Sequence, residues 1–179
     1  MKRLLSVILI TVSLLLVVSL DAGFFPALGD FWSKMSTLLM TSLYLIIIFR
    51  NSLAYTFFVV ATVFYSLSVS NLLFTPLISG LITLAIINFL LERFFTNRSY
   101  YVLIVLGAFG WFFYHLLYGL LLILLRLWSP ESLVISITYK WFTDIFLLSF
   151  IVVAFLSVGY LLTNSMSKRF KSYFIISND

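Results

Sequence analysis

Apolar residues run along this chain in long unbroken stretches instead of alternating with polar ones. Six stretches stand out, at residues 4–20, 35–49, 53–70, 72–91, 100–125 and 145–162. The hydrocarbon core of a bilayer is about 30 Å thick, so a helix needs roughly 20 mostly apolar residues to cross it. The pattern therefore predicts an all-α membrane protein, a bundle of six transmembrane helices.

The segments between these stretches are short, which predicts a single transmembrane helical domain over residues 1–179. The longest connection contains Ser129-Pro130-Glu131, and a proline followed by an acid is typical of the first turn of a helix. We therefore expect a short interfacial helix near 130–139, with Trp128 and Trp141 beside it at the depth of the lipid headgroups.

The first apolar stretch resembles a secretory signal because it follows Met1-Lys2-Arg3. It is 17 residues long, however, and Ser19-Leu20-Asp21-Ala22 is a poor cleavage site for a signal peptidase. We therefore expect residues 4–20 to remain as the first transmembrane helix.

The distribution of lysine and arginine predicts the orientation. With the N-terminus inside, eight basic residues lie on the cytoplasmic side, and they are Lys2, Arg3, Arg50, Arg93, Arg98, Lys168, Arg169 and Lys171. Three lie outside, and they are Lys34, Arg126 and Lys140. Because cytoplasmic loops carry an excess of positive charge, both termini are predicted to be cytoplasmic, in a multi-pass protein of the cell (inner) membrane.

The composition agrees with this assignment and narrows the function. Apolar residues make up 63% of the chain and charged residues 9%, whereas soluble domains carry about 25% charged residues. A water-soluble enzyme is thereby excluded. The chain has no cysteine, which removes disulfides, thiolate metal sites and thiol nucleophiles. The net charge of +5 follows from the topology, so we expect the lipid bilayer and no nucleic acid as a partner.

Groups that could carry out chemistry are sparse and scattered. The six acids lie at the ends of the apolar stretches or between them, and they are Asp21, Asp30, Glu92, Glu131, Asp144 and Asp179. Catalysis needs titratable groups that converge, and His115 alone cannot form a metal site. We therefore expect no enzyme activity, no catalytic or metal-ligating residues and no cofactor.

Two sets of residues are candidates for binding. The first is a polar cluster on the external side of the third to sixth predicted helices, and it consists of Ser66, Ser70, Asn71, His115 and Tyr118. Such residues would line a small-molecule pocket, or they would make hydrogen bonds between helices of the bundle, with His115 as a neutral imidazole. The second set is Gly107 and Gly110, whose spacing would let a partner helix approach closely, or would serve packing inside the chain.

The arrangement of the central stretches resembles the rod shape-determining protein MreD family. A helix ends at the basic turn Arg50-Asn51-Ser52, the next leads into the turn 68–76 ending in Thr75-Pro76, and a third runs into the basic segment 92–99. The basic start and the turn at Phe25-Pro26 also fit. The similarity covers roughly residues 4 to 125 and concerns layout more than strict motifs. An acid usual near the end of the third helix is replaced here by Ser68, Ser70 and Asn71.

This resemblance implies a small six-helix protein that serves as a non-enzymatic scaffold of the bacterial cell-shape and wall-elongation machinery. The implied partners are a bitopic shape protein, a polytopic glycosyltransferase, a class B transpeptidase and, indirectly, a cytoskeletal filament. The MreD fold resembles the substrate-binding subunits of energy-coupling-factor vitamin transporters, which are the alternative. Those subunits dock through small residues spaced i, i+4 on the first helix. Ser6, Thr11, Ser13 and Ser19 form no such pair.

Overall fold

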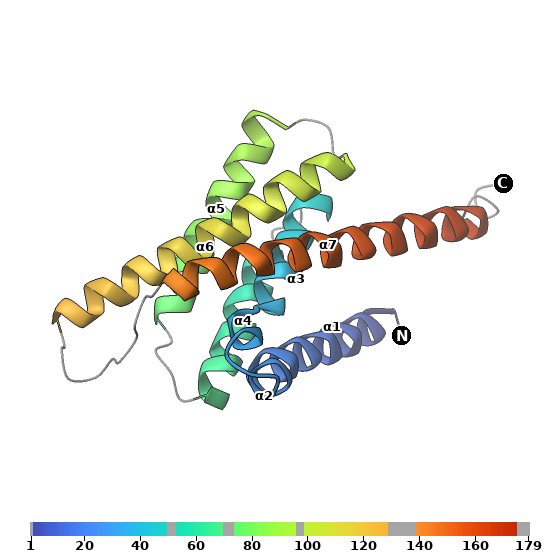
Figure 1. Cartoon of the computed structure of the whole chain (residues 1–179). Coiled ribbons are helices and arrows are strands. Elements are labelled where there is room, and N and C mark those ends of the chain that lie inside the picture. Colours follow the sequence, from blue (N-terminus) through green and yellow to red (C-terminus); the bar gives the residue numbers. More distant parts are fainter. Residues whose placement is uncertain (1, 50–52, 70–73, 96–98, 129–138, 175–179) are drawn as a thin grey trace.

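The computed structural model describes residues 2–49, 53–69, 74–95, 99–128 and 139–174, and every regular element in these ranges is a helix (Figure 1). The elements in chain order are α1 (Lys2–Ser19), the π-helical turn η1 (Leu20–Phe24), α2 (Phe25–Ala27), the 3-10 turn η2 (Trp32–Lys34), α3 (Thr37–Phe49), α4 (Leu53–Val69), α5 (Phe74–Arg93), α6 (Tyr100–Trp128) and α7 (Tyr139–Phe174). The all-α prediction is confirmed.

Three helices contain stretches that are long and apolar enough to cross a membrane. These stretches are Phe74–Arg93, Tyr100–Leu125 and Lys140–Asn164, and they lie in α5, α6 and α7. Shorter apolar helices cover Thr11–Ala27, Thr37–Ile48 and Leu53–Val69. In a membrane a helix satisfies its backbone N–H and C=O groups internally, which is why continuous apolar runs fold this way. The protein therefore has the helices of a membrane protein, and six crossings remain a prediction.

The last helix is longer than the sequence pattern predicts. α7 begins at Tyr139, before the predicted start of the last stretch at residue 145. The apolar pattern excludes Lys140 and Asp144 because both are charged. The helix nevertheless includes Asp144, because its carboxylate pairs with Lys34. Of the predicted interfacial helix, residues 130–138 lie outside the described part of the chain.

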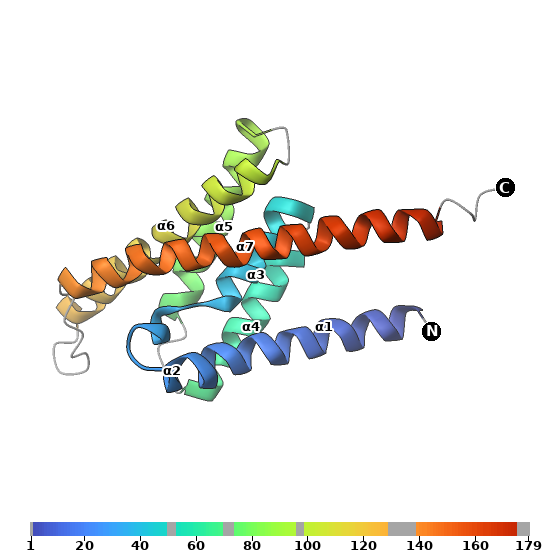
Figure 2. The ribbon, with the colours of Figure 1, turned by 45° about the vertical axis from the view of Figure 1, so that its right-hand side comes forward.

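Helix α3 forms the centre of the fold. It packs against each of the other long helices, α1, α4, α5, α6 and α7. Leu39, Leu43 and Ile47 of α3 have no exposed surface. Helices α1 and α7 lie on different sides of this centre, and α1 starts at the end of the molecule where α7 finishes (Figures 1 and 2).

A turn between α2 and α3 brings polar residues back toward the bundle. Gly29 has a φ of 110°, a value that L side chains rarely adopt, and its N–H donates to Pro26 O at 3.2 Å. The chain then passes through η2 and enters α3. This path places Ser36 beside Asp21, just after the end of α1, and Lys34 beside α6 and α7.

Candidate functional site

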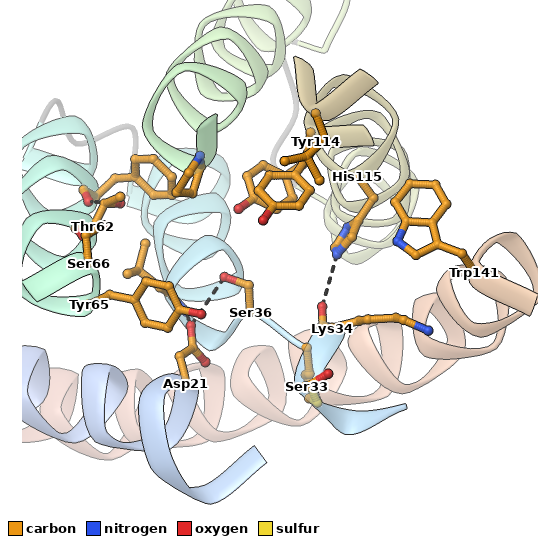
Figure 3. Close-up of a pocket in the computed structure, with 16 residues that line it drawn as sticks. Asp21, Ser33, Lys34, Ser36, Thr62, Tyr65, Ser66, Tyr114, His115 and Trp141 are labelled. Carbon is orange, nitrogen blue, oxygen red and sulfur yellow. Dashed lines mark hydrogen bonds between the residues drawn. The ribbon is translucent and has the colours of Figure 1, made fainter. Parts of the chain in front are cut away.

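A cavity of about 280 Å³ lies where the ends of several helices meet (Figure 3). Side chains from η1, η2, α3, α4, α5, α6 and α7 surround it. The lining residues are Asp21, Ser33, Lys34, Met35, Ser36, Leu38, Phe58, Thr62, Tyr65, Ser66, Pro76, Tyr114, His115, Tyr118, Leu122 and Trp141. Polar and aromatic residues predominate in this wall, although most of the chain is aliphatic or phenylalanine.

Asp21 joins the end of α1 to the start of α3. One carboxylate oxygen accepts from Thr37 N at 2.7 Å and Thr37 Oγ1 at 2.6 Å. The other accepts from Leu38 N at 3.0 Å and Ser36 Oγ at 3.3 Å. The backbone donors are the first N–H groups of α3, which have no partner within the helix, so Asp21 caps α3 from another element.

The backbone hydrogen bonds of Asp21 fit an ionised carboxylate. The N–H groups of Thr37 and Leu38 can only donate, and they donate to different oxygens of the carboxyl group. An ionised carboxylate accepts at both oxygens.

His115 connects α6 to the segment before α3. Its Nε2 lies 3.0 Å from Lys34 O, and its Nδ1 lies 3.1 Å from Trp111 O (Figure 3 shows the first contact). A neutral imidazole has a single N–H and therefore donates to one of these two carbonyls. The Trp111 ring packs beside the imidazole, with ring centroids 4.3 Å apart. These contacts agree with the packing interpretation of His115.

Lys34 forms an ion pair across the cavity margin. Its Nζ donates to Asp144 Oδ2, and this connects η2 to α7. The two side chains are 21% and 10% exposed, so water screens the pair only in part. Together with the His115 contact, the pair holds the η2 segment against α6 and α7.

Aromatic side chains line much of the cavity. Tyr114 and Tyr118 follow each other on α6 with ring centroids 6.1 Å apart, and Tyr65 reaches the cavity from α4. Trp141 enters from α7 because Gly119 of α6 leaves room for its ring, which would stand 2.9 Å from a Cβ placed there. Figure 3 shows Tyr65, Tyr114 and Trp141 spread around the opening.

The structure brings together part of the predicted polar cluster. Ser66, His115 and Tyr118 all line the cavity. Ser66 also donates to Thr62 O at 2.8 Å within its own helix. Ser70 and Asn71 lie outside the described residues.

The two candidate partner-contact glycines face the interior of the chain. A Cβ at Gly107 would collide with Leu156 of α7. A Cβ at Gly110 would lie 2.9 Å from Leu43 Cδ2 and 3.3 Å from Ile87. Both glycines therefore allow close packing of α6 within the chain, and these contacts favour that alternative over a partner helix.

Sequence reasoning missed several lining residues that sit next to ones it found. Tyr114 precedes His115 and lies one turn from Tyr118, and Tyr65 precedes Ser66. The i, i+4 spacing of the two α6 tyrosines was a usable signal. The sequence held no comparable signal for Asp21 and Lys34. Their positions depend on the turn at Gly29, and a pattern of apolar stretches does not predict such a turn.

These features define a helical protein with membrane-spanning character and a polar, aromatic cavity. Among the described residues, no group of three or more His, Asp or Glu side chains is placed to hold a metal ion. No family model, no curated protein and no solved structure matches the chain.

Proposed function

We propose that the protein crosses the inner membrane six times with both termini in the cytoplasm. Three candidate spans and three shorter apolar helices supply the crossings. The eight-to-three bias of basic residues supports the orientation. α1 starts and α7 finishes at the same end of the molecule, which fits an even number of crossings (Figure 2). The cavity, at the junction of α1 with α3, then lies toward the external side.

As its function we propose a non-enzymatic scaffold of the bacterial wall-elongation machinery. One observation carries this proposal: the buried charged groups are engaged in contacts that hold the chain together. Asp21 caps α3, and Lys34 pairs with Asp144. Charges used in this way support an architectural role, in which the protein acts through the surfaces that its helices present in the membrane.

The layout of the helices gives a second line of support. α4 and α5 cover Leu53–Val69 and Phe74–Arg93, close to the stretches on which the MreD resemblance rests. The outer faces of α6 and α7 are apolar and rich in aromatic residues, with Phe109, Phe112, Phe146 and Phe150 all exposed. Such faces suit lateral recognition of other membrane helices, because the connections are too short to bury a standard interface of about 800 Å² per partner.

Affinity capture from the native host tests this proposal. We expect a tagged chain, solubilised in mild detergent, to retain a bitopic shape protein, a polytopic glycosyltransferase and a class B transpeptidase. A tagged polytopic protein of similar size from the same membrane provides the matched control. Enrichment of these partners no greater than with that control would contradict the scaffold role.

The cavity favours a second candidate, a substrate-binding subunit of an energy-coupling-factor-type transporter. Small-molecule sites have volumes of about 300–1,000 Å³, and the cavity of about 280 Å³ is close to the lower limit of this range. Its proposed external position is the one a solute-capturing subunit requires. Co-purification with an ATPase module, and loss of solute uptake on deletion of the gene, are the outcomes this candidate predicts.

A further inference from the structure

Asp21 is an acid at the cavity with no cation paired to it among the described residues, so when it is ionised its negative charge is unbalanced. Within the described residues, Asp21 receives hydrogen bonds from two backbone N–H groups and two hydroxyls, all of them neutral. The ammonium of Lys34, which also lines the cavity, is paired with Asp144. With Asp21 ionised and His115 neutral, the charged side chains at and beside the cavity sum to one negative charge. This favours a cationic ligand over an anionic one.

The Asp21 carboxylate has no capacity left for a ligand hydrogen bond. A carboxylate offers about four lone-pair positions, and four donors already occupy them. A bound cation would therefore feel the charge of Asp21 without a direct hydrogen bond to it. A primary ammonium would have to find its acceptors among the hydroxyl groups of the wall, whereas a cation without N–H groups needs none.

The wall also offers aromatic contacts. Tyr65, Tyr114 and Tyr118 come from α4 and α6. All three line the cavity together with Asp21, and the ring centroids of Tyr114 and Tyr118 are 6.1 Å apart. Aromatic rings attract cations through the negative potential of their faces, and desolvated sites strengthen this attraction. A cluster of aromatic rings around one unbalanced carboxylate is the chemistry that suits an alkylated ammonium.

The volume sets the size of the ligand. A water molecule takes about 30 Å³ in the liquid, so a cavity of about 280 Å³ has room for roughly nine non-hydrogen atoms at that spacing. Tetramethylammonium and choline are within this limit.

From these observations we propose that the cavity binds a small quaternary ammonium ion beside Tyr65, Tyr114 and Tyr118, in the field of Asp21. The proposal deepens the second candidate function, solute binding, on which it rests, and it is independent of the scaffold role. Free choline and the choline headgroup of a lipid share this chemistry, and the two sources are separated in the experiment below.

The test is calorimetric titration of the purified full chain in nanodiscs of phosphatidylglycerol, a lipid without a quaternary ammonium. We expect choline and tetramethylammonium to bind. We expect 3,3-dimethylbutan-1-ol, the uncharged carbon analogue of choline, to bind at least about tenfold more weakly. Repeating the titration in phosphatidylcholine nanodiscs identifies the source: weaker apparent choline binding there indicates that the lipid headgroup occupies the site, and unchanged binding indicates a free solute.

Substitutions at Tyr118 and Asp21 place the binding in the cavity. We expect Tyr118→Leu to weaken choline binding by at least about tenfold, and more than Tyr118→Phe, which keeps an aromatic ring. The matched control is Tyr101→Leu, because Tyr101 lies on the same helix with 76% of its surface exposed. Asp21→Asn, which removes the charge, should also weaken binding, and the Tyr118 variants decide the matter if this variant does not fold.

Three results would overturn the proposal. They are equal binding of choline and its uncharged analogue, no binding of either, and equal loss of affinity in the Tyr118→Leu and Tyr101→Leu variants. If the uncharged analogue binds in the cavity while choline does not, the ligand class is wrong and solute binding itself stands. Failure of every probe contradicts solute binding as well.

Discussion

Replacing Asp21 by alanine tests the contact that the structure makes most specific. Asp21 is 6% exposed and caps α3 from η1. The Asp21→Ala change leaves the N–H groups of Thr37 and Leu38 without their acceptor. Both residues are buried, so water could reach these N–H groups only through the adjoining cavity.

The expected cost follows from these two donors. A buried donor that loses its partner costs about 1–3 kcal/mol, and loss of a helix N-cap costs about 0.5–2 kcal/mol. The two descriptions overlap, since the same N–H groups are counted in both. The Thr37 hydroxyl keeps an alternative acceptor in Val17 O at 3.3 Å. We therefore expect a loss of roughly 2–5 kcal/mol in the free energy of unfolding.

Reversible unfolding in mixed detergent micelles, followed by tryptophan fluorescence, provides the measurement. Trp111 is fully buried and Trp141 is half-buried beside the cavity, so both report on this region. The matched control is Asp30→Ala, because Asp30 is an exposed acid in the same connection and should change stability by less than about 0.5 kcal/mol. Equal stabilities of the Asp21→Ala and Asp30→Ala variants would refute the capping role.

Two further predictions concern packing and the ion pair. Gly80→Ala should destabilise the protein by about 1–3 kcal/mol, because the Phe58 ring occupies the space that a Cβ needs. The control Gly23→Ala has open space around it and should be neutral or slightly stabilising. Thermal unfolding of both variants measures the difference. The single changes Lys34→Met and Asp144→Asn should each cost more than half of the double change, because each leaves one charge unpaired. A double-mutant cycle measures this coupling, and strictly additive costs would contradict it.

The helices were predictable from the sequence because one physical rule governs them. A run of apolar residues in a membrane must satisfy its own backbone, and a helix does so. The predicted stretch 53–70 accordingly matches α4, and the stretch 72–91 comes within two residues of α5 at each end. The rule fails at Lys140 and Asp144, which belong to α7 because Asp144 finds its partner in a distant part of the chain.

The site was only partly predictable from the sequence, because it too depends on contacts between distant parts of the chain. Ser66, His115 and Tyr118 stood out as polar positions inside apolar helices, and all three line the cavity. Asp21 and Lys34 lie between two predicted apolar stretches, where the apolar pattern predicts no structure. Their roles arise from a turn at Gly29 that brings Ser36 and Thr37 within reach of Asp21, a tertiary relationship that no single stretch of sequence expresses.

Depletion of the protein in a rod-shaped native host tests the central claim, the scaffold role in wall elongation, most directly. Cell shape by microscopy and the sites of new wall insertion by a fluorescent wall precursor are measured together as the protein disappears. The account predicts that growing cells lose their rod shape and that wall insertion along their sides becomes disordered. Cells that remain rods with normal wall insertion would contradict it.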